Sequence, residues 1–264
     1  MPEPVQVTTR ARLLLAPNPS PMTLEGTNTW LLAEPAADVC VVVDPGPDDD
    51  AHLRAIAATA SDSGQRIAAI LLTHSHPDHA AGAPALSRLV GAPVHARDVA
   101  YGDPLAAAYD LAGLHLDVLP TPGHSADSVC FVVRGDDAVL TGDHVLGRGT
   151  SVVVHPDGRM GDYLASLERL RSLHPGVLLP GHGPIVRDPE AVLAEYVRHR
   201  EQRLAELCSA VAAGADTPEA LVSAIYPQLD PQLNGFAGLT VLAGLALLVD
   251  RGQVRRDGDR YSAP

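Results

Sequence analysis

The stretch IAAILLTHSHPDH, residues 67–79, decides the fold of this chain. Residues 67–72 are a short continuous apolar run, the pattern of a strand buried on both faces of a sheet. The run leads directly into four side chains that can bind a metal ion: His74, His76, Asp78 and His79. Ligands gather at such strand ends in α/β proteins, and zinc binds both imidazole and carboxylate. The stretch therefore predicts a metal site.

Three further ligand candidates follow along the chain, each at the end of a strand-like segment. They are His124 in TPGH (121–124), Asp143 in TGD (141–143) and His182 in PGHG (180–183). The glycines that flank His182 allow the backbone to approach the site closely. One Gly-His turn is weak evidence for a ligand. Four such elements in sequence favour a metal centre over a solvated, histidine-rich loop.

Strands and helices alternate around these motifs, which indicates an α/β architecture. Predicted strands occupy residues 27–33, 39–44, 67–72, 93–95, 115–119, 128–134, 137–141 and 177–180, and predicted helices occupy 48–60, 83–90 and 161–173. From residue 188 the pattern changes to helices at 189–213, 217–225 and 236–250, followed by a hairpin with Asp257-Gly258 as its turn. We therefore divide the chain into a hydrolase domain (1–187), a linking helix (188–214) and a small C-terminal domain (215–264).

The composition limits the partners and the location. The net charge is −13 and all 19 basic residues are arginine, which argues against a large non-specific nucleic-acid surface. No apolar run approaches the roughly 18 residues needed to span a bilayer, and the N-terminus is a poor signal peptide. Three cysteines, Cys40, Cys130 and Cys208, lie singly in apolar segments, so we expect free thiols in a reducing compartment. These features predict a cytoplasmic protein that does not associate with membranes.

The series THSHPDH, TPGH, TGD and PGHG resembles the metallo-β-lactamase superfamily over roughly residues 10–187. The resemblance implies an α/β fold of the αββα type, a four-layer sandwich. It also implies one metal ion held by His74, His76 and His124, and a second held by Asp78, His79 and His182, with Asp143 bridging the two. The phrases NPSPMTLEGTNTWLL (18–32) and GDHVLGRGTSVV (142–153) are most similar to the lactamase-beta-2-like hydrolases, as is the winged-helix-like tail. Some members of that family are endoribonucleases selective for single strands.

This ligand set implies a hydrolase that uses two divalent metal ions, which we expect to be zinc. Two such ions trap a water molecule between them and lower its pKa enough to give hydroxide at neutral pH. Asp78 is the predicted catalytic residue, because it can orient this nucleophile and pass a proton to the leaving group. Around the ligands, Asp44 and His144 are candidates for hydrogen bonds to ligand side chains, and His155 is a weaker candidate for the substrate pocket.

The predicted substrate is a small molecule or single-stranded RNA. Cleavage of single-stranded RNA comes from the resemblance alone, and the acidic composition speaks against it. A thioester hydrolase of the glyoxalase II type is the first alternative. A β-lactamase is a second, disfavoured by the predicted cytoplasmic location and the extra domain. A non-catalytic binding protein with a metal-stabilised core is the third. The sequence leaves the oligomeric state open.

Overall fold

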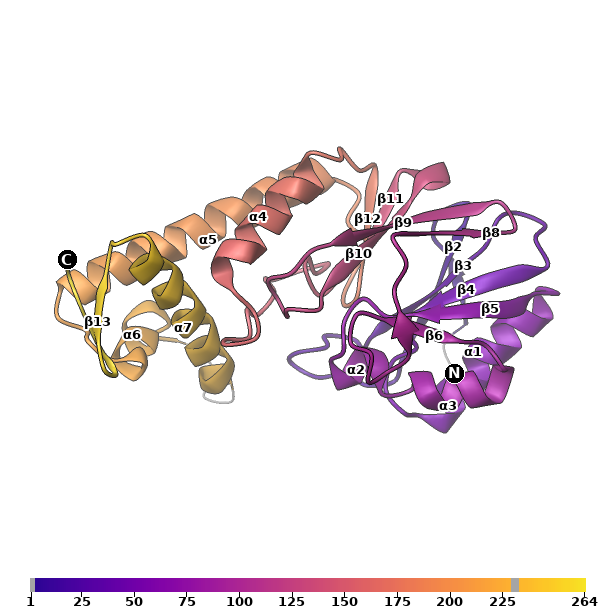
Figure 1. Cartoon of the computed structure of the whole chain (residues 1–264), viewed down its shortest axis with the longest axis horizontal. Coiled ribbons are helices and arrows are strands. Elements are labelled where there is room, and N and C mark those ends of the chain that lie inside the picture. Colours follow the sequence, from indigo (N-terminus) through magenta and orange to yellow (C-terminus); the bar gives the residue numbers. More distant parts are fainter. Residues whose placement is uncertain (1–2, 229–232) are drawn as a thin grey trace. The chain divides into compact units, whose positions relative to one another are not determined.

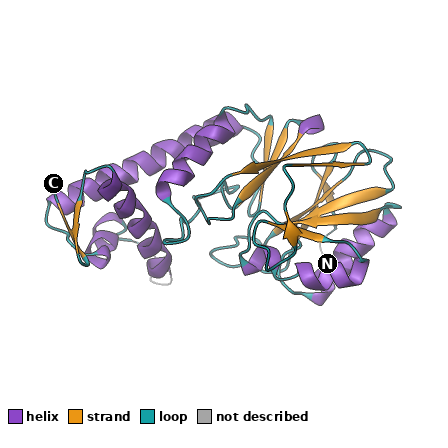
Figure 2. Ribbon diagram, viewed as in Figure 1, coloured by secondary structure: helices purple, strands orange, loops and turns teal. Residues whose placement is uncertain are grey.

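The computed structural model describes residues 3–228 and 233–264. Contacts within the chain divide it into two compact units. The first, which we call the sheet unit, comprises Met1–Pro120, Asp127–Gly149 and His174–Pro189. The second, the helical unit, comprises Thr121–Ala126, Thr150–Leu173 and Glu190–Pro264. Figure 2 shows the strands of the two large sheets in orange and the helices in purple, and Figure 1 labels most of the elements.

A seven-stranded sheet forms the first half of the sheet unit. In spatial order its strands are β1 (Val5–Gln6), β2 (Ala11–Leu15), β3 (Asn28–Leu32), β4 (Val39–Val43), β5 (Arg66–Leu71), β6 (Val94–Ala96) and β7 (Asp103–Pro104). The strands from β1 to β4 pair antiparallel, and those from β4 to β7 pair parallel. The run 67–72 lies in this parallel half, where strands are buried on both faces, as its continuous apolar pattern predicts.

A five-stranded sheet completes the sheet unit. Its spatial order is β12 (Val177–Pro180), β11 (Ala138–Gly142), β10 (Val129–Val133), β9 (Leu114–Pro120) and β8 (Ala108–Leu111). The strands pair antiparallel except for β11 and β12, which are parallel. One apolar cluster joins the inner faces of the two sheets, with Trp30 and Leu71 from the first and Phe131 and Leu179 from the second.

Helices cover the other face of the seven-stranded sheet. Successive side chains of a strand point to opposite faces, so Trp30 lies between the sheets while Leu31 packs in a second cluster with Ile56 and Leu86. These helices are α1 (Asp50–Asp62) and α3 (Ala83–Val90), with the short α2 (Pro77–Ala80) before α3. Helix α1 begins after Asp49, whose carboxylate accepts a hydrogen bond from the His52 amide at 2.8 Å, and a 3-10 turn, η1, spans Arg134–Asp136.

The helical unit contains α4 (Met160–Arg171), α5 (Pro189–Ala212), α6 (Pro218–Ile225), α7 (Asn234–Asp250) and the hairpin β13 (Arg255–Asp257) and β14 (Arg260–Ser262). Thr217 caps α6 by accepting a hydrogen bond from the Ala220 amide, a role that threonine often has before a helix. In the hairpin, Asp257 pairs with Arg260. The two-residue turn is therefore Gly258-Asp259, one residue later than predicted.

The predicted strands and helices between residues 27 and 250 are confirmed within a few residues at each end. Several strands were not predicted, among them β2 and β8. Residues 229–232, between the two predicted helices of the C-terminal domain, lie outside the described residues. The division at residues 187 and 214 stays a prediction.

Candidate metal centre

The histidine-rich stretch turns sharply after β5. That strand ends at Leu71, three residues before His74. His76 has extended backbone (φ −61°, ψ 142°) and directly precedes α2, in which Pro77 is the first residue. Asp78 and His79 lie inside this helix. The change from extended to helical backbone separates the four predicted ligands into two pairs.

The other predicted ligands also follow strands. β11 ends at Gly142, next to Asp143, and β12 ends at Pro180, two residues before His182. Because these two strands are parallel, their carboxyl ends lie at the same edge of the sheet. His124 follows β9 by four residues. His74, His124, Asp143 and His182 therefore lie within four residues of a strand end, whereas Asp78 and His79 lie in the short helix α2.

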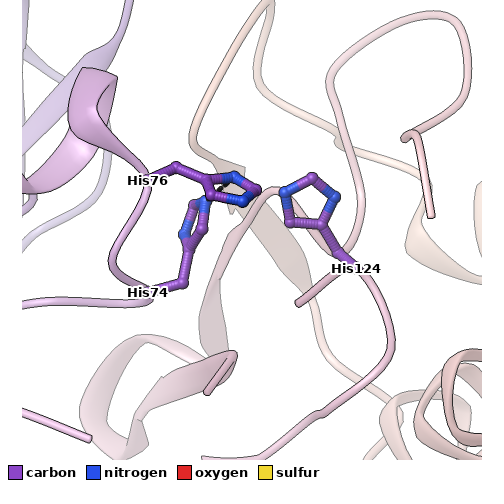
Figure 3. Close-up of side chains that lie close together, drawn as sticks. All are labelled: His74, His76 and His124. Atoms are coloured by element: carbon purple, nitrogen blue, oxygen red, sulfur yellow. Dashed lines mark hydrogen bonds between the residues drawn. The ribbon is translucent and has the colours of Figure 1, made fainter. Parts of the chain in front are cut away.

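The structure gathers the seven residues into two groups, in each of which the ligand atoms lie within 4.8 Å of one another. The first group is His74, His76 and His124, whose imidazole rings approach one another in Figure 3. His74 Nε2 lies 3.1 Å from His76 Nδ1. The other nitrogen of His74, Nδ1, lies 3.0 Å from Thr73 Oγ1. A neutral His74 with its proton on Nδ1 therefore directs the lone pair of Nε2 toward His76.

The orientation of His124 is set in the same way. Its Nδ1 donates to the backbone carbonyl of Val152 at 2.5 Å and lies 3.1 Å from Ser151 Oγ. A proton on Nδ1 leaves Nε2 with its lone pair, the form of imidazole that binds a metal. Arg200 in turn donates to the carbonyl of Ser151. His124 is thus held by a backbone segment that a buried arginine supports.

The second group is Asp78, His79, Asp143 and His182. His79 Nε2 lies 3.1 Å from His182 Nε2 and 3.2 Å from Asp143 Oδ1. His182 Nε2 lies 3.4 Å from Asp143 Oδ1 and 3.1 Å from Asp78 Oδ2. A tetrahedral zinc ion with bonds of about 2.0–2.1 Å places its ligand atoms about 3.3 Å apart. These four separations are close to that spacing, and His79 Nε2 lies 3.7 Å from Asp78 Oδ2.

The protonation of the two histidines supports the same interpretation. His79 Nδ1 donates to Asp44 Oδ2 at 2.9 Å, and His182 Nδ1 donates to the carbonyl of Gly26 at 3.1 Å. When neutral, both rings therefore present the lone pair of Nε2 to the carboxylates of Asp78 and Asp143. Four acceptor atoms that face one another repel unless a cation lies among them. This donor set fits a divalent metal ion.

The pKa values of the group reflect a strong demand for positive charge. Burial alone would lower the pKa of His79, but the carboxylates of Asp143 and Asp44 raise it well above its usual value. Burial would also lower the pKa of His182, but the carboxylates of Asp143 and Asp78 raise it to about 9. Although burial would raise the pKa of Asp143, His182 and His79 hold it well below its usual value. Protons or metal ions can meet this demand.

Asp44 supports the second group, as predicted. It is buried, follows β4, and has a left-handed backbone (φ 52°). Besides His79, it accepts hydrogen bonds from the amide of Thr73 at 2.8 Å and from Thr73 Oγ1 at 2.7 Å. One carboxylate thus fixes the ring of a ligand and the backbone that leads into the histidine-rich stretch.

His144 and His155 were also predicted to lie near the ligands. His144 is buried beside Asp143, and its hydrogen bond to a ligand stays a prediction. His155 lines a cavity of about 690 Å³ in the helical unit, together with Thr217, Arg256 and Tyr261. It belongs to neither ligand group.

The segment Gly26-Thr27-Asn28 contacts the second group, and no role was predicted for it from the sequence. Gly26 accepts the hydrogen bond of His182, and Thr27 Oγ1 donates to the carbonyl of Asp78 at 2.9 Å. The available signal was the run of polar residues directly before an apolar strand. Such residues are buried here, and buried polar groups need partners.

Comparison with known proteins agrees with the fold. The sequence profile described as "Metallo-beta-lactamase superfamily" matches residues 22–116 and 96–182. The chain belongs to this superfamily. A second profile, "Beta-lactamase associated winged helix domain", matches residues 217–262. The predicted metallo-β-lactamase fold with a C-terminal winged-helix domain is confirmed, and the protein is a hydrolase of this fold.

Three similar proteins illustrate the relationship. The lactamase-like protein adaB of Aspergillus niger is 32% identical over 219 residues, which cover 80% of this chain and 67% of that protein. The atrochrysone carboxyl ACP thioesterase of Aspergillus fumigatus is 29% identical and is matched over 87% of this chain and 77% of its own. A metallo-β-lactamase family protein from Thermus thermophilus has a TM-score of 0.80 at 25% identity, covering 96% of this chain and 98% of that one.

These names support the superfamily and leave the finer predicted relationship unsupported. The fungal relatives are named lactamase-like proteins or a thioesterase, so they give the predicted relationship to endoribonucleases no support. As for membranes, no helix within residues 3–228 and 233–264 is long and apolar enough to cross one.

Proposed function

We propose that this protein hydrolyses acyl thioesters at a centre of two divalent metal ions. The observation that carries the proposal is the pair of neighbouring ligand groups. The rings of His74, from the first group, and His79, from the second, have centroids only 4.3 Å apart, so two ions bound there would be close neighbours. The thioester specificity is supported by the relative that is named an ACP thioesterase.

The first ion would be held by His74, His76 and His124. The second would be held by Asp78, His79 and His182, and Asp143 would bridge the two. Zinc is the proposed metal, because it accepts imidazole and carboxylate in compact sites of low coordination number. Five imidazoles make magnesium and calcium poor candidates, since these ions prefer oxygen ligands.

Bound at this place, two divalent ions would lower the pKa of water and withdraw charge from the thioester carbonyl. Asp78 has the most exposed side chain of the second group, at 30%, against 12% for Asp143. Although burial would raise the pKa of Asp78, its contacts with His182 and His79 lower it. Its carboxylate therefore stays ionised at neutral pH, able to orient water through one oxygen. His79 and His182 are held by Asp44 and Gly26, which keeps their Nε2 atoms directed inward.

The leaving group suits this arrangement. A thiol has a pKa of about 8.5, so it departs as thiolate with little help from an acid. Asp78 can then return the proton it has taken from water to the thiolate. No serine or cysteine needs to form a covalent intermediate, and Cys40 is unsuited to do so because burial raises its pKa to about 11.

The charges of the C-terminal hairpin speak against RNA as the substrate. Arg256 pairs with Asp259 at 3.8 Å, and Arg260 pairs with Asp216. Phosphate binding requires uncompensated positive charge. Within the described residues, two of the three arginines of this hairpin, Arg256 and Arg260, thus have acidic neighbours.

The proposed location is the cytoplasm. Cys40, Cys130 and Cys208 are free cysteines, and the first two are buried. Free thiols persist in reducing compartments, which supports this location.

The test is a substrate panel on zinc-loaded protein. The panel contains acyl thioesters of N-acetylcysteamine with chains of different length, a single-stranded RNA and a chromogenic β-lactam. Thiol release is measured with a thiol reagent. We expect thioester cleavage by the wild type and none by Asp78→Ala purified in the same way. Cleavage of the RNA or the β-lactam without any thiol release would refute the proposed substrate class. Failure of the wild type to bind two ions per chain would refute the metal centre itself.

A further inference from the structure

The segment Gly26-Thr27-Asn28 lies directly beside the loop that carries His182. Thr27 and His182 form an antiparallel bridge outside the named strands. The amide of Asn28, the first residue of β3, donates to the carbonyl of Gly181 at 2.7 Å. Two segments more than 150 residues apart in the sequence are therefore joined along their backbones at a predicted ligand.

Asn28 adds a second connection through its side chain. Its Nδ2 donates to the carbonyl of Pro180 and to that of Gly183, both at 2.9 Å. An amide nitrogen has two hydrogens, and both are used here. The two carbonyls flank Gly181 and His182, so the amide closes the loop on both sides of the ligand. Asn28 is only 2% exposed, and water therefore cannot replace these bonds.

The two preceding residues contact ligands themselves. The carbonyl of Gly26 accepts the Nδ1 proton of His182 at 3.1 Å. Gly26 has φ +137°, and a Cβ there would lie 2.1 Å from the carbonyl oxygen of Ala16, so only glycine fits. Thr27 is completely buried and donates from Oγ1 to the carbonyl of Asp78 at 2.9 Å. Three consecutive residues thus orient two of the four members of the second group.

We propose that Gly26, Thr27 and Asn28 form a clasp that positions His182 and Asp78 and thereby sets the affinity of the second metal position. Asn28 is its principal positioning residue, because its amide holds the loop on both sides of His182. The inference rests on the proposed metal centre, although not on the thioester specificity. Residues that orient metal ligands change metal affinity 10–100-fold in other proteins, and the clasp is expected to act in that range. None of its contacts involves His76 or His124, so the first position should be spared.

The test is zinc titration of Asn28→Ala and Thr27→Val in competition with a chromophoric chelator. Thr27→Val keeps the shape of the side chain and removes only the hydroxyl. We expect one of the two zinc ions to bind about 10–100-fold more weakly in Asn28→Ala, and the other to bind with unchanged affinity. The titration curve should approach that of His182→Ala and differ from that of His76→Ala. Thr27→Val should show a smaller loss at the same position.

Arg10→Gln is the control for a general loss of stability. Arg10 lies in the same unit and binds Glu34 and Asp136, but it contacts no predicted ligand. Equal weakening of both ions in Asn28→Ala and Arg10→Gln would show that the clasp acts only on the fold. Unchanged affinity in both clasp variants would also refute it. If Asn28→Ala does not fold, the zinc titration of Thr27→Val tests the proposal. A wild type that binds no zinc would instead overturn the proposed metal centre, which keeps the two failures distinct.

Discussion

Asp44 Oδ2 accepts a hydrogen bond of 2.9 Å from His79 Nδ1, and both side chains are almost completely buried. Asp44→Ala would leave the His79 and Thr73 donors without an acceptor. An unsatisfied buried donor costs about 1–3 kcal/mol, so we expect a loss of about 3 kcal/mol in the free energy of unfolding. The second zinc ion should also bind about 10–100-fold more weakly. Chemical denaturation and zinc titration measure the two effects.

The matched control for this change is Asp50→Ala. Asp50 pairs with Arg54 on the surface of α1, and its side chain is 81% exposed. Such a pair contributes roughly 0–1 kcal/mol, so neither the unfolding free energy nor zinc affinity should change appreciably. An Asp44→Ala variant that behaves like the control would show that His79 is oriented by other contacts.

Gly181→Ala tests the close approach of backbone to the second group. A Cβ on Gly181 would lie 2.6 Å from His79 Cε1 and 2.7 Å from Asp143 Oδ1. Such overpacking costs about 1–3 kcal/mol, and here it displaces two ligands directly. We expect at least a tenfold loss of affinity for the second zinc ion. Gly176→Ala, just before β12, is the control, because its Cβ would meet its nearest neighbours at an ordinary 3.4 Å. Equal zinc affinity in the two variants would contradict the prediction.

Much of the fold was predictable, because local patterns matched the final environment of each segment. The run at 67–72 lies in a parallel part of the sheet, and its apolar pattern requires burial on both faces. β2, in contrast, consists of ARLLL, in which Arg12 and Leu13 are half-buried. Its register is set by pairing with β3, from Ala11 opposite Leu32 to Leu15 opposite Asn28. Strand formation of this kind depends on neighbours, which a local pattern does not contain.

The same distinction holds for the metal centre. Its proposed ligands could be picked out because histidine and aspartate at strand ends have few other roles. Asn28 was not, because its function depends on carbonyl groups of Pro180 and Gly183, and any residue has a carbonyl. Asn28 and Pro180 are 152 positions apart in the sequence. No local pattern shows that two such distant segments will contact each other in the fold.

Arg200→Met is expected to weaken the first metal position. Arg200 is buried on α5, donates to the carbonyl of Ser151 and lies 5.0 Å from the ring centre of Tyr163. Ser151 and Val152 hold Nδ1 of His124. Methionine keeps part of the apolar stem but loses the bond, so the ion assigned to His74, His76 and His124 should bind about tenfold more weakly. Arg203→Met is the control, because Arg203 lies on the same helix as Arg200. It pairs with Glu206 and lies 5.1 Å from the ring centre of Tyr226. A loss of zinc affinity in both variants would indicate that the substitutions disturb α5 itself.

Asp78→Ala should abolish turnover and leave the fold largely intact, because it removes the proposed proton carrier but only one of seven ligands. His144→Ala should reduce turnover at most about 10–100-fold, as expected if its predicted role is to hydrogen-bond a ligand rather than the substrate. His155→Ala should have a smaller effect, since His155 lines the cavity of the helical unit. Turnover is measured on the thioester that the panel identifies. Near wild-type activity in Asp78→Ala would contradict its catalytic role.

His52 predicts how the stability of the fold changes with pH. Burial lowers the pKa of His52 to about 4, although Asp49 opposes the shift slightly, and Nε2 lies 2.9 Å from Thr29 Oγ1. In the unfolded chain the pKa returns to about 6.5. Between these values the unfolded state binds a proton that the folded state does not, so stability falls as the pH decreases from about 6.5 to about 4. The loss assigned to His52 is about 3 kcal/mol. It is measured as the difference between wild type and His52→Gln in chemical denaturation across this range, because other groups titrate equally in both. A difference that stays constant with pH would show that His52 titrates normally in the folded protein.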